Sequence, residues 1–229
     1  MGTTNEFTNL DKIFKLMKFL NFSKVFCLSP HPDDIELGML GTIMKFTDTH
    51  FDVLCISSGN SNDSTSHNID RKEEVTNLWA DANLPNVKIH FAKNPFFEEL
   101  NESQWIGYVE NEFIKKNDYD CIFIPTFDDS MFEHRYVNGW GPAFCRFSPI
   151  SLVEYNLPST LNHWQPNLYI DIDDQYERKV ELLQHFTSQI HRSYFQRPML
   201  DAFHSNFQCS KKGLHIVERF KLIEVILKS

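Results

Sequence analysis

Short apolar runs alternate along this chain with segments whose apolar residues recur every three or four positions. The runs lie at 24–29, 51–57, 87–92 and 121–125, and polar or turn-forming residues follow each of them. Runs of this length indicate buried β-strands, and the spacing between them indicates amphipathic helices. Strands that alternate with helices predict a parallel sheet covered on both faces. We therefore expect an α/β, Rossmann-like fold with one mainly parallel sheet.

The remaining segments extend this pattern. Further strands are expected at 150–155 and 168–172, whereas the apolar spacing of 215–227 fits a helix and a strand equally well. Helices are expected at 9–20, at 39–46, from Asp70 with a capping-box-like Glu73, after a capping Ser103, and from Asp173 or Asp174. The pattern shows no repeat and no linker, so a single domain over 1–229 is expected.

Polar loops follow three of the expected strands, at 29–36, 58–70 and 126–134. In open parallel sheets, ligands bind beyond the carboxyl ends of the strands, so these loops should converge on one edge and form the active site there. The first strand runs into H-P-D-D rather than into a G-x-G-x-x-G turn. This disfavours an ordinary dinucleotide-binding protein.

The H-P-D-D turn has the composition of a metal site. His31 and Asp34 are three residues apart and can reach one ion, Asp33 between them can stay unligated, and His134 after the fourth strand offers a third ligand. Two histidines and one carboxylate leave a coordination position for water, as in hydrolytic zinc sites, and they also suit Fe(II). An unligated carboxylate can take a proton from that water. The alternative is a turn or helix cap at Asp33 and a surface histidine at His134.

Composition limits the classes of partner. Lys and Arg total 22 against 31 Asp and Glu, a net charge of -9, which disfavours nucleic acid and anionic membranes. No apolar stretch approaches the ~18 residues of a membrane span. The five cysteines form no C-x-x-C pair, and Cys27, Cys55 and Cys121 lie in apolar runs, as reduced buried thiols do. We expect a cytoplasmic protein that acts on a small molecule and has the option of forming a homo-oligomer.

The segment "SPHPDDIELGMLGT" resembles the opening motif of the PIG-L/LmbE-like family of zinc-dependent de-N-acetylases, H-P-D-D followed by x-E-x-G-x-G-G-T. Only Leu40 departs from it, at the first glycine of the pair. Arg71 and Glu74 match the family's R-x-x-E, and "DDSMFEHR" resembles its D-x-H-x-D-H. The segments "VEYNLPST", "QPNLYIDI" and "ERKVELLQHFTSQ" extend the resemblance over most of the chain, especially to members linked to bacterial surface glycans.

The resemblance implies hydrolysis of the acetamide of an N-acetylated sugar or sugar conjugate, with one divalent metal, Zn²⁺, as cofactor. It implies that the metal ligands are His31, Asp34 and His134, that the general base is Asp33, and that the substrate contacts include Arg71, Asn94 and Glu154. For Arg71 the alternative is a structural salt bridge with Glu74 or another acid. Glu36 is expected to support the loop or to contact the metal ligands rather than touch substrate.

Two departures fall in the D-x-H-x-D-H segment. Met131 stands where the family has a histidine that stabilises the oxyanion or protonates the leaving amine, and Glu133 stands for the aspartate. Methionine does neither, so Asp33 would return its proton to the amine, or His185 or His191 would fold over the site. The alternatives are a sugar-binding member that has lost catalysis and a hydrolase of another small amide.

The sequence also suggests where three of the tryptophans lie. Trp79 and Trp105 sit in helical apolar stripes and are expected in the core. Trp140 has two interpretations, a packed core aromatic or a platform on which a sugar stacks.

Overall fold

The structure is a computed structural model that describes residues 22–57, 71–93, 97, 100–146, 148–206 and 215–226. The expected helix at 9–20, Asp70, the loop at 58–70 and Asn94 lie outside the described residues. Within those residues, every strand expected from the apolar runs is present, with its ends within two residues of the prediction.

The strands form one mixed sheet in the order β3-β2-β1-β4-β5-β8-β6, with β7 paired to β8. The strands are β1 (Lys24–Ser29), β2 (His50–Cys55), β3 (Val87–Phe91), β4 (Cys121–Pro125), β5 (Ser151–Tyr155), β6 (Leu168–Asp171), β7 (Ser205–Asn206) and β8 (His215–Glu224). The first five strands along this order, β3 to β5, are parallel, and β8 runs antiparallel to its neighbours. The expected mainly parallel α/β sheet is confirmed.

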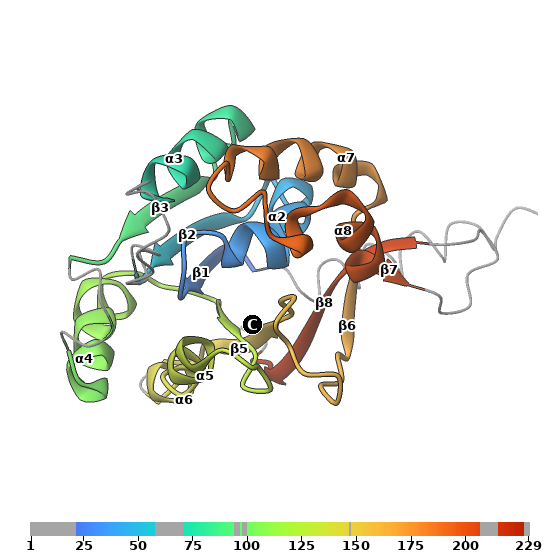
Figure 1. Ribbon diagram of the computed structural model, residues 1–229. Coiled ribbons are helices and arrows are strands. Elements are labelled where there is room, and N and C mark those ends of the chain that lie inside the picture. Colours follow the sequence, from blue (N-terminus) through green and yellow to red (C-terminus); the bar gives the residue numbers. More distant parts are fainter. Residues whose placement is uncertain are drawn as a thin grey trace, which may run out of the picture.

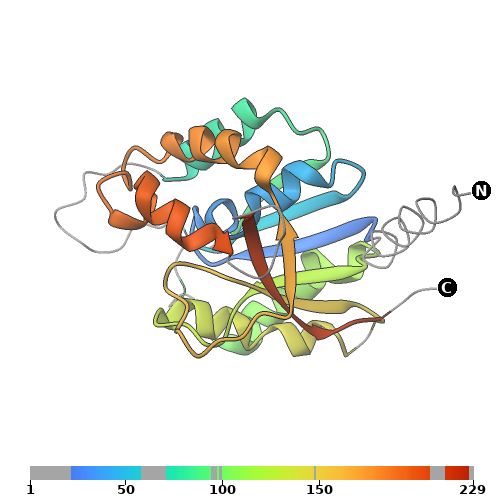
Figure 2. The ribbon, with the colours of Figure 1, turned by 90° about the vertical axis from the view of Figure 1, so that its right-hand side faces the viewer.

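Helices cover both faces of the sheet (Figures 1 and 2). One face carries α2 (Asp34–Lys45), α3 (Arg71–Ala82), α7 (Asp173–Leu182) and α8 (Arg197–His204), and the other carries α4 (Glu102–Glu112), α5 (Phe132–Asn138) and α6 (Gly141–Phe144). Short 3-10 turns lie at Ile114–Lys116, Leu183–His185 and Ser193–Phe195. Side chains of β1 alternate between the two apolar cores, with Val25 and Cys27 in one and Phe26 and Leu28 in the other. This period of two is what a strand buried on both faces requires.

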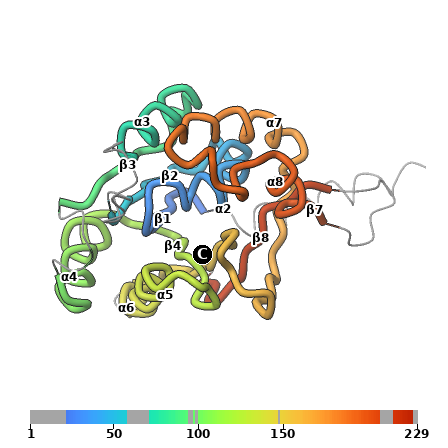
Figure 3. The backbone as a smooth tube through the Cα atoms, in the orientation of Figure 1, coloured from blue at the N-terminus to red at the C-terminus, as the bar shows by residue number. Residues whose placement is uncertain are grey.

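The ambiguous C-terminal segment is a strand. In Figure 3 the last described segment, β8, runs between β5 and β6, although both precede it in the chain. Hydrogen bonds to a strand on each side stabilise the extended form over most of its length. Local periodicity could not decide this because the deciding partners are distant in sequence, from 46 residues (Asp171 and Val217) to 72 residues (Leu152 and Glu224) away.

Helix α4 begins earlier than expected. Its N-cap is Asn101, whose side chain accepts a hydrogen bond from the backbone of Gln104, while the Gln104 side chain accepts one from the Asn101 backbone. The predicted cap, Ser103, lies inside the helix and donates to the Asn101 side chain instead. A reciprocal capping box satisfies two free N–H groups, which explains why Asn101 holds the cap position.

Helix α2 lies unusually close to its neighbours because two glycines remove the side chains that would keep them apart. A Cβ at Gly38 would lie 2.8 Å from Tyr155 Cδ2, and one at Gly41 would lie 2.7 Å from Ile172 Cδ1. These glycines belong to the motif that follows H-P-D-D. They therefore fix the depth at which the helix that carries Asp34 packs on the sheet.

A buried ion pair also contacts helix α2. Lys179 Nζ of α7 lies 2.6 Å from Glu218 Oε1 of β8, and both side chains are fully buried. Lys179 also donates to the carbonyl of Leu37, and Glu218 accepts from the backbone N–H groups of Gly41 and Thr42. Both charges are satisfied by partners on α2, as buried charges must be. Burial lowers the pKa of Lys179, and Glu218 opposes that shift.

Two further expectations about the core are met. Cys27, Cys55 and Cys121 are free and buried, and Trp79 and Trp105 are buried with exposed fractions of 8% and 0%. None of the described helices has the length and apolarity to cross a bilayer.

Candidate metal centre

Three predicted ligands meet at the carboxyl end of the sheet. His31 follows β1, Asp34 opens α2, and His134 lies in α5 after the loop from β4. Asp34 Oδ2 lies 3.2 Å from His31 Nδ1 and Asp34 Oδ1 lies 3.3 Å from His134 Nε2, while the two ring nitrogens are 3.2 Å apart. Two imidazole nitrogens and a carboxylate that face one another in this way match the donor set of a hydrolytic zinc or iron site. The residues present therefore fit a divalent metal.

The turn after β1 is built by local hydrogen bonds. Ser29 Oγ donates to the His31 carbonyl, and the backbone N–H of Asp33 donates to the same carbonyl. The His31 N–H in turn donates to Asp34 Oδ2 at 2.8 Å. The parallel pairing of β1 with β4 then brings the loop after β4, and with it His134 at the start of α5, to the same edge. The hydrogen bonds within the H-P-D-D turn thus bring the side chains of His31 and Asp34 together.

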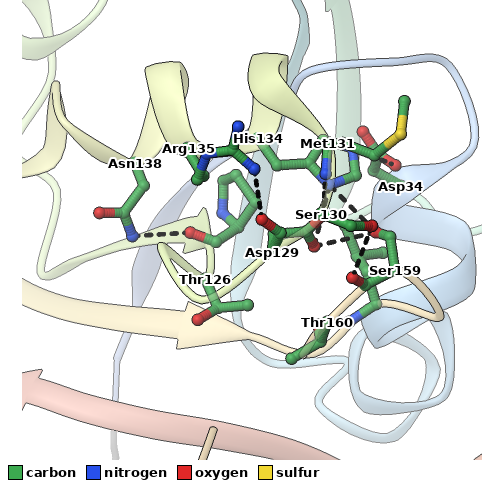
Figure 4. A network of polar contacts seen from close by, with 12 residues as sticks. Asp34, Thr126, Asp129, Ser130, Met131, His134, Arg135, Asn138, Ser159 and Thr160 are labelled. Atoms are coloured by element: carbon green, nitrogen blue, oxygen red, sulfur yellow. Dashed lines mark hydrogen bonds and ion pairs between the residues drawn. The ribbon is translucent and has the colours of Figure 1, made fainter. Parts of the chain in front are cut away.

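A second carboxylate orients His134. Asp129 Oδ2 lies 3.1 Å from His134 Nδ1 and accepts a hydrogen bond from Ser159 Oγ, while Asp129 Oδ1 accepts from the Met131 backbone (Figure 4). Ser159 Oγ also lies 3.3 Å from His134 Nδ1. With Nδ1 occupied in this way, Nε2 of His134 is the nitrogen that faces the ligand set.

Sequence reasoning assigned no role to Asp129. The available signal was its place as the first acid of the D-x-H-x-D-H-like segment, with Asp128 directly before it. The structure separates the pair, because Asp129 is 1% exposed and contacts His134, whereas Asp128 pairs with the exposed His163.

The charges of the ligand set reinforce one another. Burial raises the pKa of Asp34, but His134 and His31 outweigh it and hold that pKa well below its usual range. Burial lowers the pKa of His134, but Asp34 and Asp129 outweigh it and raise the pKa to about 10. The site therefore stabilises positive charge at the place where the three ligands meet.

Asp33 lies beside the ligand set and pairs with Arg71. Its carboxylate Oδ2 is 3.6 Å from Arg71 Nη1, and its side chain is 7% exposed. Burial raises the pKa of Asp33, and Arg71 opposes that shift. Arg71 thus reaches an acid other than Glu74. Burial and then the charge of Asp33 raise the pKa of Tyr194.

The two ends of the R-x-x-E pattern have different contacts. Glu74 accepts hydrogen bonds from Thr187 Oγ1 and from both the N–H and the Oγ of Ser188. Glu74 therefore ties α3 to the segment after α7, and Arg71 at the start of the same helix is directed to Asp33.

Two other predicted acids are held by protein groups. Glu154 accepts hydrogen bonds from Thr126 Oγ1, the Phe127 N–H, Asn138 Nδ2 and Trp164 Nε1. These four donors favour a structural role for Glu154, bracing the loop after β4, over the expected contact with substrate. Glu36 accepts a hydrogen bond from Trp79 Nε1 and so joins α2 to α3, and burial raises its pKa to about 7.

The two histidines considered as replacements for the missing one, His185 and His191, do not contact the ligand set in the described structure. His185 pairs with Asp81 at 2.9 Å on the surface, and His191 is exposed. Met131 is 42% exposed at the start of α5, and Trp140 is fully buried and stacks on Trp105 at a ring separation of 5.7 Å. Trp140 is thus a packed core aromatic rather than a sugar platform.

Comparison with known proteins agrees with the site. The family described as GlcNAc-PI de-N-acetylase (PIG-L) matches residues 26–144, just over half of the chain. A diacetylchitobiose deacetylase from Thermococcus kodakarensis is 42% identical over 59 residues, which is 21% of this chain and 22% of that protein. The chain thus matches only about a fifth of the length of that curated relative.

Solved structures show the same fold at low identity. The N,N'-diacetylchitobiose deacetylase from Pyrococcus horikoshii has a TM-score of 0.68 and 20% identity, with 98% of this chain and 94% of that chain covered. The A40926 pseudoaglycone deacetylase has a TM-score of 0.64 and 13% identity, with 90% and 99% covered. The 4-carboxy-2-hydroxymuconate hydratase GalB from Pseudomonas putida KT2440 has a TM-score of 0.65 and 12% identity, with 90% and 98% covered.

A hydratase among the neighbours shows that the fold alone does not fix the reaction, so the assignment depends on the family match and on the site. The H-P-D-D turn, both histidine ligands and Arg71 all lie within the matched residues. The chain belongs to the PIG-L family of GlcNAc-PI de-N-acetylases.

Proposed function

We propose that the protein is a zinc-dependent hydrolase that removes the acetyl group from an N-acetylated sugar or sugar conjugate. The observation that carries this proposal is the cluster of His31, Asp34 and His134 with the unligated Asp33 beside it. This arrangement supplies a metal site and a separate base, the two parts that hydrolysis of an amide by water needs. Family membership identifies the acetamide as the bond to be cleaved.

His31, Asp34 and His134 would hold the metal, and Asp129 with Ser159 keeps the His134 ring oriented. When bound, a zinc ion supplies an activated water at neutral pH and polarises the carbonyl that is attacked. The protein's own part is to hold these groups rigidly, because misplacing a reacting group by about 1 Å can cost about 100-fold in rate.

Asp33 is the proposed general base. It accepts one proton from the attacking water at a carboxylate oxygen and then gives that proton to the leaving amine, so that acetate and the free amino sugar are the products. Arg71 restrains the Asp33 carboxylate through their ion pair, and a contact between Arg71 and the substrate is part of this proposal. Met131 offers no proton, so a single carboxylate performs both transfers.

The test is release of acetate from a panel of N-acetylhexosamines and their conjugates by the zinc-loaded protein. We expect turnover that falls by at least about 100-fold in Asp33→Asn, within the range that general-base groups contribute. Asp174→Asn, at an exposed position in α7, is the matched control and should keep wild-type turnover. The absence of acetate from every member of a broad panel would overturn the proposal.

Met131 supports one competing function, a sugar-binding member that has lost catalysis. That protein would bind N-acetylated sugars without releasing acetate. Acetate release that depends on Asp33 would reject this alternative. If the protein cleaved only amides that are not sugars, it would instead be a hydrolase of another small amide.

The proposal extends to the protein's location, domain organisation and partner. Buried free thiols at Cys27, Cys55 and Cys121 support a cytoplasmic location, where thiols stay reduced. The one sheet of the described residues supports a single catalytic domain for the chain. The family match supports a small N-acetylated molecule as its partner, and the net charge of -9 disfavours nucleic acid. A homo-oligomer is compatible with this proposal.

A further inference from the structure

A row of aromatic rings leads from the metal centre to the surface. The His31 ring lies 6.4 Å from Phe97, Phe97 lies 6.2 Å from Tyr136, and Tyr136 stacks on Phe132 at 5.7 Å with an angle of 15° between the rings. Phe132 is 63% exposed, whereas the other rings are partly buried. We call Phe97, Tyr136 and Phe132 the aromatic wall. One end of this wall therefore touches a metal ligand and the other end meets solvent.

Two buried tryptophans, Trp105 and Trp140, pack against the aromatic wall. Phe97 lies 6.1 Å from Trp105 and 6.4 Å from Trp140, and Tyr136 lies 5.4 Å from Trp140. The Trp105 indole also donates a hydrogen bond to the Phe97 carbonyl at 3.1 Å. Because both tryptophans are fully buried, the wall is preformed and would lose little conformational entropy on binding a ligand.

Other exposed apolar side chains lie on the same segments as the metal site. Phe127 and Met131 are 57% and 42% exposed on the loop before α5, and Leu161 is 41% exposed on the loop before β6. The two loops are joined, since the Leu161 N–H donates to the Asp128 carbonyl and the Ser130 N–H donates to Ser159. Half of the exposed large apolar residues in the described part of the chain are these three and Phe132. Such a concentration beside a proposed active site indicates a ligand-binding surface.

Met131 has a specific place in this surface. Its backbone N–H holds Asp129, the residue that orients the ligand His134, so its position relative to the metal centre is fixed. At the position where the family pattern has an ionisable histidine, this chain has an apolar and polarisable thioether. Methionine in place of histidine makes this edge of the site apolar instead of polar.

We propose that the aromatic wall, with Met131, binds an apolar group attached to the N-acetylated sugar, so that the preferred substrate is a sugar carried on an alkyl or aryl aglycone. The inference rests on the proposed function and specifies its substrate class. The exposed side chains of Phe127, Met131, Phe132 and Leu161 have no hydrogen-bonding groups of the kind that hold sugar hydroxyls. An apolar aglycone gains instead from the area it removes from water.

The test compares two glycosides of N-acetylglucosamine that differ only in the aglycone, the octyl and the methyl β-glycosides, below the concentration at which the octyl compound forms micelles. We expect kcat/KM to be at least tenfold higher for the octyl glycoside in the zinc-loaded wild type. Phe132→Ala should lower this octyl-to-methyl ratio about tenfold, and Phe132→Tyr, which keeps the ring, should restore it. Met199→Ala, at a 49% exposed position in α8, is the matched control and should keep the wild-type ratio.

A second arm does not depend on catalysis. Calorimetric titration with octyl β-glucoside, which has no acetamide, should show binding to the wild type that weakens about tenfold in Phe132→Ala. A wild-type ratio near one, or a ratio and a binding constant unchanged by Phe132→Ala, would overturn the inference. Binding that depends on Phe132 without acetate release from either glycoside would support the wall and reject the proposed function. An oligomer that dissociates in Phe132→Ala would instead assign this surface to contacts between copies of the chain.

Discussion

Adding one methyl group at Gly38 should weaken the fold at the base of the metal centre. The new Cβ would lie 2.8 Å from Tyr155 Cδ2 and 3.0 Å from the carbonyl oxygen of Asn156. Neither neighbour can move freely, since Tyr155 is fully buried with its hydroxyl bonded to the Leu28 carbonyl, and the other contact is backbone. Helix α2 must therefore shift away from the sheet.

The size of the effect follows from two opposing contributions to the free energy of unfolding. Replacing glycine by alanine inside a helix stabilises a protein by roughly 0.5–1 kcal/mol, while overpacking a rigid core costs about 1–3 kcal/mol. Gly107 isolates the first contribution, because it lies inside α4 and a Cβ there would have no neighbour within 4 Å. We expect Gly107→Ala to be more stable than wild type and Gly38→Ala to be less stable, with about 1–3 kcal/mol between the two variants.

Urea unfolding at equilibrium measures this difference. With a slope of about 2 kcal/mol/M, a gap of about 2 kcal/mol separates the two midpoints by about 1 M. Because Gly38 lies one helical turn after the ligand Asp34, Gly38→Ala should also bind zinc more weakly than wild type. A Gly38→Ala protein as stable as Gly107→Ala would refute the reasoning, since it would show that α2 has room for a side chain on the sheet side.

Three further predictions concern positioning, buried charge and pH. Asp129→Asn should weaken zinc affinity about 10–100-fold in competition with a chelator, whereas Asp128→Asn, one residue earlier and paired with an exposed histidine, should not; equal effects would contradict the orienting role. Lys179→Met leaves a buried carboxylate without its counter-charge and should cost about 3–5 kcal/mol of unfolding free energy, far more than Arg178→Met at the neighbouring exposed pair; similar losses would show that the buried pair is not special. Burial lowers the pKa of His204, so below about pH 6.5 the unfolded chain binds a proton that the folded chain does not, and stability falls. Between about pH 6.5 and pH 5 the wild type should lose up to about 1.4 kcal/mol per pH unit more than His204→Leu, and parallel curves would contradict the assignment.

The parts of the fold that were predictable depend on local sequence. Five of the strands are short apolar runs with turn residues after them, and they pair in parallel as expected. The segment His215–Glu224 was not decidable, because its strand state depends on hydrogen bonds to β5 and β6, which are distant in sequence. The start of α4 was misplaced because Asn101 and Ser103 are both good cap residues, and the choice depends on the reciprocal bond to Gln104.

The candidate site divides in the same way. The proximity of His31, Asp34 and His134 was predictable, because His31 and Asp34 belong to one turn and His134 follows a strand that ends at the same edge. The contacts of Asp129 and Glu154 were not, because a carboxylate's role depends on which donors surround it in three dimensions. Asp129 contacts the predicted ligand His134, whereas the donors around Glu154, two of them in the loop after β4, join that loop to β5.

The central claim is that His31, Asp34 and His134 together hold one metal ion. The most direct test is metal content by mass spectrometry on the wild type, His134→Ala and the control His163→Ala, whose imidazole is 68% exposed and pairs only with Asp128 among the described contacts. The account predicts about one zinc or iron per chain in the wild type and in His163→Ala, and its loss in His134→Ala. Wild-type protein that binds no metal after incubation with zinc and iron salts, or a His134→Ala protein with the same content as wild type, would contradict it.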